Sequence, residues 1–397
     1  WKIGPFSLWQ NIGIKKVCKL MKKEKYEIGE WVKELIKKDN PRFYELEKNK
    51  KTCYDLKTKK TSLETNEPQL IKLNSVRKKT IINTKNTNLS DIQDETALLE
   101  IKENITTKKT TEEVLKAIRY AERNFSGLVL KLNNNKNPFN VFLGEHLHDI
   151  VNKETKKIEE TIRLVQKLNS KIKSSSIPTV CLLSGFVSGP NLGLAMYSNK
   201  RSCYTESYLG VVELGFGLIP IGGVTNELLK KLDQGITPGD PENNRLSFLQ
   251  ENFTFKKVSS SAQTAKRNGL LDPRESLVFN PKKTISEAKN KIKQLNKKGF
   301  VSDSKNTKLI ARGSQSLAVL YTQTENLKES GFLSDYDKHV SDKYSFLLCG
   351  GEVSERTKVD ESYFLKLEKE IYMELCSETK TIERVEYFIK NKTTLRN

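Results

Sequence analysis

A single carboxylate, Glu213, lies within a run that is otherwise apolar and rich in glycine, Tyr208–Thr225. Burial among such neighbours raises the pKa of a carboxyl group, which suits it to donate and accept protons near neutral pH. The residues leave a second interpretation open, in which Glu213 lies at an edge and binds a backbone amide or a lysine. The run also holds Gly215-x-Gly217, but without the third glycine of a dinucleotide motif and without the Lys-Ser/Thr pair of a phosphate loop. It therefore offers an acid/base candidate and does not indicate a nucleotide site.

A second glycine-containing segment, Gly185–Met196, directly follows an apolar stretch, Pro178–Leu183. A strand, a glycine turn and the start of a helix together can present backbone N–H groups to a ligand anion. Taken alone, the segment is also explained by a tight strand-to-helix connection, which is the more common case.

Histidine and cysteine offer little further chemistry. His146-Leu147-His148-Asp149 is one short His-x-His with no distant partner, so we expect no metal site. The three histidines form no Ser-His-Asp or Cys-His set. The six cysteines are scattered without paired spacing, which indicates small core residues in a reducing cytoplasm.

These candidates lie in a region of alternating strand and helix patterns, which we assign to a domain over residues 94–275. Strands are predicted at Thr96–Ile101, Gly127–Leu132 and Pro178–Leu183, with helices from Thr110 and over Glu154–Ile172 between them. Strands separated by helices of this length predict an α/β domain with right-handed crossovers.

The segments on either side of this domain have different sequence patterns. Residues 1–60 predict helices at Pro5–Lys23 and Ile28–Lys38 and a small hairpin between Phe43 and Leu56, and the polar residues 61–93 predict a linker or loose edge structure. Residues 276–397 predict a helical domain. Its helices are expected at Lys283–Lys298, Arg312–Ser330, Ser334–Leu348, Glu361–Cys376 and Thr379–Lys392.

The formal net charge of +20 suggests nucleic acid as a partner at first sight. However, 56 of the 69 basic residues are Lys, and they are spread over every segment, whereas a binding face would be clustered. The longest uncharged stretch, Ser174–Asn199, contains Pro178, Gly185 and Gly189 and is expected to be buried core rather than a membrane span. With no secretory signal pattern, we expect a cytoplasmic protein that binds neither nucleic acid nor membrane.

Several short motifs, in order and spacing, resemble the large bacterial 3-hydroxyacyl-CoA dehydrogenases that are fused to an enoyl-CoA hydratase-like (crotonase-like) half. The motifs are Trp1–Trp9 (WKIGPFSLW), Phe125–Leu132, Leu209–Leu228, Lys257–Ala262 (KVSSSA), Gly331–Asp337 (GFLSDYD) and Thr393–Asn397 (TTLRN). Because residue 1 is Trp and the opening motif resembles the end of the dehydrogenase part, this chain is expected to be the C-terminal portion of such a protein.

The resemblance implies a fold: an α/β crotonase-like (ClpP/crotonase) core of repeated ββα units at 94–275. It would be flanked by an N-terminal helical remnant of the dehydrogenase at 1–60 and by a C-terminal all-α domain at 276–397. It also implies fatty-acid β-oxidation, acyl-CoA as the small-molecule substrate and a possible homo-oligomer. NAD belongs to the full-length family, and no cofactor is expected in this chain.

The resemblance also assigns site residues. One oxyanion amide would come from about Glu145, in Gly144-Glu145, and the other from Pro190, or from Gly189 if the turn is shifted by one. One catalytic carboxylate falls on Glu213, whereas Gly193 occupies the position of the second. Pro190 has no N–H and Gly193 no carboxylate, so a degraded hydratase site is expected. The alternative is a non-catalytic crotonase-fold scaffold or oligomerisation remnant.

Overall fold

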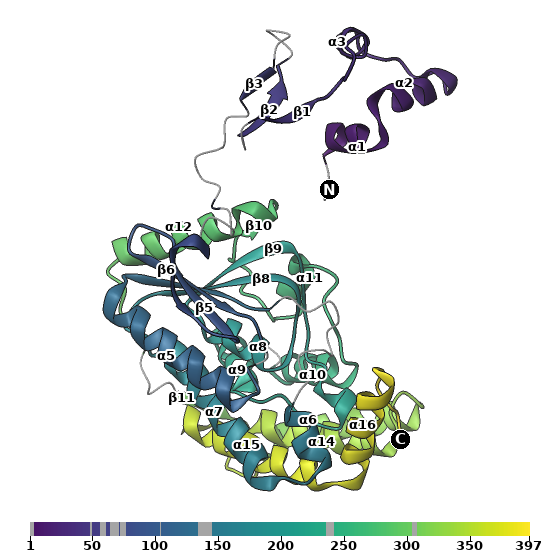
Figure 1. Cartoon of the computed structure of the whole chain (residues 1–397). Coiled ribbons are helices and arrows are strands. Elements are labelled where there is room, and N and C mark those ends of the chain that lie inside the picture. Colours follow the sequence, from purple (N-terminus) through teal and green to yellow (C-terminus); the bar gives the residue numbers. More distant parts are fainter. Residues whose placement is uncertain are drawn as a thin grey trace. The chain divides into compact units, whose positions relative to one another are not determined.

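The structure is a computed structural model that describes residues 4–47, 50–55, 61–63, 71, 77–103, 105–133, 145–235, 242–303 and 308–397. The chain divides into two compact units, Trp1–Gln69 and Leu70–Asn397, whose elements are labelled in Figure 1.

The N-terminal unit combines three helices with a small antiparallel sheet. Its elements are α1 (Pro5–Ile12), α2 (Ile14–Lys23), α3 (Glu30–Leu35), β1 (Tyr44–Glu47), β2 (Lys50–Tyr54) and β3 (Thr61–Leu63). The predicted hairpin is confirmed, with β3 as a third strand. The single helix predicted at Pro5–Lys23 is wrong, because the backbone at Gly13 adopts φ +101° and separates α1 from α2. The rings of Trp31 and of the exposed Phe6 pack against Phe43, which is buried in the core of this unit.

A seven-stranded sheet organises the larger unit. Its strands are β4 (Thr80–Asn83), β5 (Thr87–Asp91), β6 (Thr96–Ile101), β7 (Gly127–Lys131), β8 (Thr179–Val187), β9 (Lys200–Leu209) and β10 (Leu277–Val278). They lie in the order β10-β9-β8-β7-β6-β5-β4. Pairing is parallel from β6 to β10 and antiparallel from β4 to β6. The three predicted strands and the α/β architecture are therefore confirmed.

Of the two alternatives predicted for residues 61–93, a linker is wrong for the second half, which forms β4 and β5 at one edge of this sheet. The composition is polar because the polar groups bond to one another: Asn88 donates to Ser90 at 3.1 Å, and the hydroxyls of Thr84 and Thr87 lie 3.0 Å apart. Leu89 supplies the buried apolar contact of β5.

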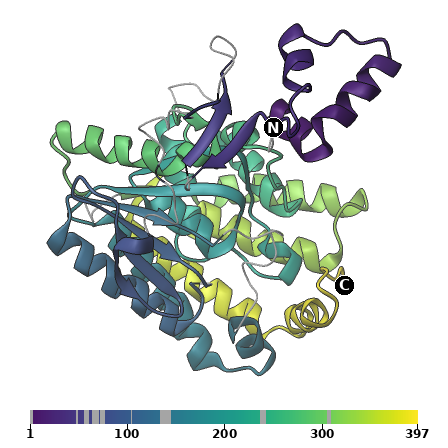
Figure 2. The same ribbon diagram turned by 45° about the horizontal axis from the view of Figure 1, so that its top comes forward.

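Alternate residues of the strands face two different helical layers, as the period of a β-strand requires. Leu99, Leu130 and Cys181 belong to the main core together with α5 (Lys108–Asn124) and α7 (Thr155–Lys173). Their sequence neighbours Leu98, Val129 and Val180 pack against Ile285, Ala288 and Ile292 of α12 (Thr284–Lys297). Figures 1 and 2 show α12 on the face of the sheet opposite to α5.

The remaining elements complete the larger unit. They are the short 3-10 helices η1 (Arg77–Lys79), η3 (Glu213–Phe216) and η4 (Pro281–Lys283), strands β11 (Lys308–Ala311) and β12 (Thr357–Asp360), and helices α6 (Glu145–Val151), α8 (Gly189–Tyr197), α9 (Val224–Gly235), α10 (Glu242–Thr254), α11 (Ala262–Arg267), α13 (Gly313–Glu329), α14 (Asp335–Cys349), α15 (Glu361–Ser377) and α16 (Thr379–Asn391).

The five C-terminal helices agree with their predicted positions, but the expectation of an all-α domain at 276–397 is wrong. β11 and β12 pair there as an antiparallel ribbon. The helices also belong to the same compact unit as the sheet, because Tyr344, Phe364 and Phe388 lie in the same hydrophobic core as Leu99 and Leu130.

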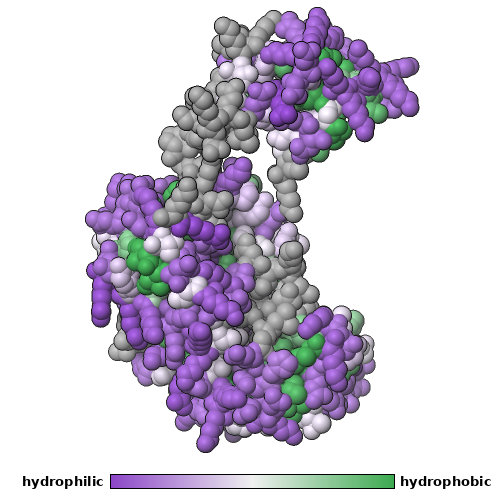
Figure 3. Space-filling model, in the orientation of Figure 1, coloured by the Kyte–Doolittle hydropathy of each residue, from purple (hydrophilic) through white to green (hydrophobic). Residues whose placement is uncertain are grey.

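Ser174–Asn199 contains β8 and α8 and is mostly buried, as predicted. No helix in the part of the chain that the structure describes is long and apolar enough to cross a membrane. The face shown in Figure 3 is largely hydrophilic, in keeping with lysines spread along the whole sequence.

Candidate functional site

Glu213 opens the 3-10 turn η3, which follows β9 and ends at Gly217 with φ +74°. Its side chain is buried, and its Oε2 atom has no hydrogen-bond partner among the described residues. Burial raises the pKa of Glu213 to about 7, although the backbone amides of residues 212 and 213 lower it. The predicted burial and raised pKa are confirmed, and no lysine forms an ion pair with Glu213 within the described ranges.

Two buried tyrosines from other helices interact electrostatically with this carboxylate. Tyr344 of α14 and Tyr372 of α15 are both buried, and burial together with the charge of Glu213 raises the pKa of each hydroxyl. Tyr372 and Nε2 of His146, in α6, share a hydrogen bond of 2.8 Å. Burial lowers the pKa of His146 to about 4, so this imidazole is neutral at pH 7.

Two buried polar atoms lack hydrogen-bond partners among the described residues: Oε2 of Glu213 and Nδ1 of His146, whose ring is linked to this group through Tyr372. An unpaired buried polar group typically costs about 1–3 kcal/mol, so such groups are retained where water or a ligand completes their hydrogen bonds. The region around Glu213 is therefore suited to receive a polar group.

Glu368 of α15 is a second buried carboxylate, and its charge acts on Glu213. Its Oε1 atom accepts hydrogen bonds from the N–H groups of Gly222 at 2.7 Å and Gly223 at 3.2 Å and from Gln166 at 3.0 Å. Burial raises the pKa of Glu368 to about 7 against the lowering effect of these donors.

The sequence does contain a signal for Glu368, which is a charged residue at a core-facing position of an otherwise apolar helix face. Phe364, Glu368, Ile371 and Leu375 follow one another at helical spacing on one face of α15, and all four are buried. A glutamate on a buried face requires hydrogen-bond donors within the core. Here the backbone N–H groups of Gly222 and Gly223 are those donors.

The glycine turn predicted at Gly185–Met196 is a strand-to-helix connection: β8 ends at Val187, Ser188 caps the helix, and α8 begins at Gly189. Pro190 is fully enclosed in the first turn of α8 and has no N–H to donate. Gly189 has φ +57° and retains its N–H.

Gly193 lies against a side chain that fills the neighbouring space. A Cβ atom at this position would lie 2.7 Å from Nδ2 of Asn169, which itself donates to the carbonyl of Gly222 at 2.8 Å. Position 193 thus lacks a carboxylate and also lacks room for one in this arrangement.

Gly144 lies outside the described residues. Glu145 is the first residue of α6 and is exposed, and it forms no hydrogen bond to Glu213, Gly189 or Pro190 among the described residues. The described interactions link Glu213 to Gly222 through Glu368, and Gly222 to the side chain of Asn169 beside Gly193. His148 is exposed whereas His146 is buried against Tyr372, so this His-x-His pair does not share one environment.

The C-terminal helices fix the position of η3. Arg384 of α16 donates to the carbonyl of Leu214 at 2.9 Å and forms a buried ion pair with Asp337 at 2.9 Å. Thr381 donates to the carbonyl of Gly217 at 2.8 Å. The turn that carries Glu213 is thereby held at both ends.

No protein-family model matches this chain. A probable 3-hydroxyacyl-CoA dehydrogenase of Bacillus subtilis is 28% identical over 400 residues, which cover 100% of this chain and 50% of that protein. A protein of Rickettsia felis, described as a fatty acid oxidation complex trifunctional enzyme, is 26% identical over 245 residues, which cover 59% of this chain and 29% of that protein. The chain thus spans half or less of the length of these curated relatives.

Among solved structures, an enoyl-CoA hydratase from Rhodobacter sphaeroides superposes with a TM-score of 0.50 at 14% identity, covering 79% of this chain and 92% of that one. This likeness establishes the fold of the core, the crotonase-like fold of enoyl-CoA hydratases. The predicted fold class is confirmed to that extent.

Proposed function

We propose that this chain binds acyl-CoA thioesters in fatty-acid β-oxidation, with the thioester beside Glu213. The observation that carries the proposal is Glu213 itself: a buried carboxylate with an unpartnered oxygen and a pKa raised to about 7, in a fold shared with enoyl-CoA hydratases. The names of the two curated relatives, a 3-hydroxyacyl-CoA dehydrogenase and a fatty acid oxidation enzyme, support the same substrate class.

The chemistry would consist of holding a thioester carbonyl while a proton moves at the adjacent carbons. Glu213 is suited to exchange that proton, because a group with a pKa near the working pH populates both of its forms. One amide near Gly144 and Glu145 would donate to the carbonyl oxygen. The second donor is missing if Pro190 holds its position, and it would be the amide of Gly189 only if the turn is shifted by one residue. In this proposal the chain uses no cofactor of its own, and the CoA thioester is its substrate.

We propose further that hydratase turnover is slow. Loss of one oxyanion donor typically lowers turnover about 100- to 1000-fold, and loss of one acid/base group typically lowers it by a further 100-fold or more. Pro190 and Gly193 account for these two losses, and Asn169 occupies the space beside Gly193.

Because the chain matches 50% of the Bacillus subtilis protein, we also propose that it acts as the C-terminal portion of a fused dehydrogenase, with NAD chemistry supplied by another part of that protein. A second candidate function is a non-catalytic scaffold or oligomerisation module. The Asn169 side chain beside Gly193 favours it, because a carboxylate at position 193 would require that side chain to move.

Isothermal titration of the purified chain with acetoacetyl-CoA tests the binding proposal. The parent chain should bind saturably, Glu213→Gln should bind with altered affinity, and Glu251→Gln, a surface change in an ion pair with Lys257, should match the parent. Circular dichroism verifies that each variant is folded. Absence of binding by the folded parent would exclude the acyl-CoA proposal and leave the scaffold, whose oligomeric state light scattering measures.

Hydration of crotonyl-CoA tests the degraded site. We expect turnover at least about 100-fold below that of a typical enoyl-CoA hydratase measured side by side. Comparable turnover would show that the assignment of Pro190 and Gly193 to catalytic positions is wrong.

A further inference from the structure

A cavity of about 510 Å³ lies between the C-terminal end of α8 and helices α9 and α12. None of the residues that line it belongs to the surroundings of Glu213 described above, so it is a separate feature of the fold. Its lining is rich in cations: Lys173, Arg201, Lys230, Lys231 and Lys298. Three carboxylates also line it: Glu227, Asp272 and Asp303.

Two of the lysines are already neutralised. Lys173 lies 2.5 Å from Glu361, and Lys230 lies 2.5 Å from Glu227 and 3.5 Å from Glu361. The hydroxyl of Tyr197 also donates to Glu361, at 2.6 Å. These residues bond to one another along one wall of the cavity, and we assign them a structural role.

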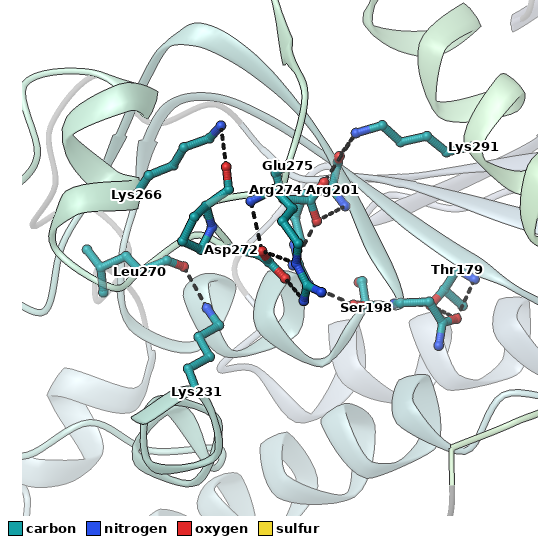
Figure 4. Close-up of polar contacts among 12 residues, drawn as sticks. Thr179, Ser198, Arg201, Lys231, Lys266, Leu270, Asp272, Arg274, Glu275 and Lys291 are labelled. Atoms are coloured by element: carbon teal, nitrogen blue, oxygen red, sulfur yellow. Dashed lines mark hydrogen bonds and ion pairs between the residues drawn. The ribbon is translucent and has the colours of Figure 1, made fainter. Parts of the chain in front are cut away.

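Arg201 also has polar partners within the protein, as Figure 4 shows. It pairs with Glu275 at 2.7 Å and donates to the carbonyl of Ser198 at 3.1 Å. The second bond covers a carbonyl at the C-terminal end of α8, where the helix dipole would otherwise repel an anion.

One of the lining carboxylates, Asp272, forms an ion pair with Arg274, which does not line the cavity. Arg274 holds Asp272 with two hydrogen bonds, at 2.9 and 3.1 Å (Figure 4), and these hold the pKa of Asp272 well below its usual range. Asp272 is therefore ionised and paired with Arg274, and its charge still acts on Lys231.

Of the lining cations, Lys231 and Lys298 form no ion pair among the described residues; Lys298 is exposed, whereas Lys231 is partly buried. The Nζ atom of Lys231 donates to the carbonyl of Leu270 at 3.0 Å (Figure 4), and no carboxylate lies within ion-pair distance of it in the described part of the chain. Burial lowers the pKa of Lys231 to about 7, and Arg201 on β9 lowers it as well. Glu227 of α9 and Asp272 and Glu275 of the segment before β10 act in the opposite direction. An anion in the cavity would restore the full charge of this lysine.

We propose that this cavity binds a small phosphorylated molecule, with its phosphoryl group beside Lys231. A phosphoryl dianion accepts several hydrogen bonds and supplies Lys231 with the close anionic partner that it lacks among the described residues. The volume of about 510 Å³ is well beyond that of a bare phosphate, so the rest of a small phosphomonoester fits with it. The proposal is independent of the acyl-CoA site.

Titration calorimetry with sulfate, at constant ionic strength set with chloride, tests the anion site. Sulfate does not titrate near neutral pH, so any proton taken up on binding comes from the protein. The parent chain should bind sulfate saturably and take up close to one proton at pH 8, where free Lys231 is mostly neutral, and less at pH 6. Buffers of different ionisation enthalpy measure this uptake.

Two variants separate charge from structure. Lys231→Met should weaken binding at least about tenfold, or about 1.4 kcal/mol. Lys231→Arg should retain binding without proton uptake, because arginine stays charged at pH 8. Lys282→Met, on the exposed turn η4, should behave as the parent.

Phenyl phosphate tests the ligand class and should bind the parent more tightly than inorganic phosphate does. Absence of saturable sulfate binding, unchanged binding by folded Lys231→Met, or proton uptake that persists in Lys231→Arg would each overturn the site. Equal affinities for phenyl phosphate and inorganic phosphate would overturn the phosphorylated molecule as its ligand.

Discussion

Both carboxylate oxygens of Glu368 accept hydrogen bonds from the backbone N–H of Gly223, at 3.2 and 3.0 Å. The glycine belongs to the turn after the Glu213 segment, and the glutamate lies about 145 residues later in the chain, in α15. The C-terminal helices are therefore built into the core around Glu213 and are not an accessory to it.

Glu368→Ala should lower the free energy of unfolding by on the order of 3 kcal/mol, because it leaves the N–H groups of Gly222 and Gly223 unpaired in the core. Urea denaturation measures this. Glu370→Ala, an exposed position on the same helix, is the matched control and should have an effect below about 0.5 kcal/mol. Equal effects of the two changes would show that the turn does not depend on Glu368.

The stability of the fold should depend on pH through Glu213. Its pKa is raised from an ordinary 4.5 to about 7 on folding, so its contribution is fully present below about pH 4.5 and is lost as the pH rises through 7. Glu213→Gln cannot ionise and should therefore gain stability over the parent between pH 5 and pH 8, by on the order of 3 kcal/mol. Urea unfolding at both pH values measures the gain. A difference between variant and parent that is the same at both values would contradict the raised pKa.

Arg384→Met should destabilise the chain by about 3–5 kcal/mol, because it removes the buried partner of Asp337 and the donor to Leu214. Arg396 contacts the same aspartate at 3.4 Å but is more than half exposed, so Arg396→Met should cost less than about 1 kcal/mol. Chemical denaturation of both variants checks this order. A reversed order would remove Arg384 as the residue that holds η3.

Gly193→Ala should cost about 1–3 kcal/mol, because its methyl group would lie 2.7 Å from the Asn169 amide. In an Asn169→Ala background the same change should be close to neutral. A double-mutant cycle by urea denaturation measures the coupling. The same penalty in both backgrounds would show that Asn169 is not the obstacle.

Pro190→Ala restores a backbone N–H at the position of the missing oxyanion donor. If the chain binds crotonyl-CoA as proposed, this variant should raise the hydration rate by up to about 100-fold, and the activity should still fall short of a complete site because Gly193 remains. Steady-state hydration assays of the parent and the variant measure the ratio. An unchanged rate with unchanged binding would exclude Pro190 from the oxyanion position.

Local patterns were sufficient to predict much of this fold. The strand at Thr96–Ile101 and the five C-terminal helices lie where the apolar periodicity placed them, and Glu213 is buried because its neighbours in sequence are apolar. Burial of a residue within an apolar run is a local property, so one sequence is enough to predict it.

Other features depend on contacts that a local pattern does not contain. Asn169 and Gly193 meet through the packing of α7 on α8, and Glu368 meets Gly222 across nearly 150 residues. β5 was not predicted as a strand because its buried polar side chains bond to one another, so that its composition is typical of a linker or loose edge structure. Such features are set by tertiary contact rather than by propensity.

The position of Asn169 also bears on how this site can evolve. A glutamate at position 193 meets the amide of Asn169, whereas removal of Asn169 alone takes a hydrogen bond from Gly222 and brings no carboxylate in return. A carboxylate at position 193 is therefore accommodated only where the Asn169 side chain moves or is replaced, so the two positions are expected to change together.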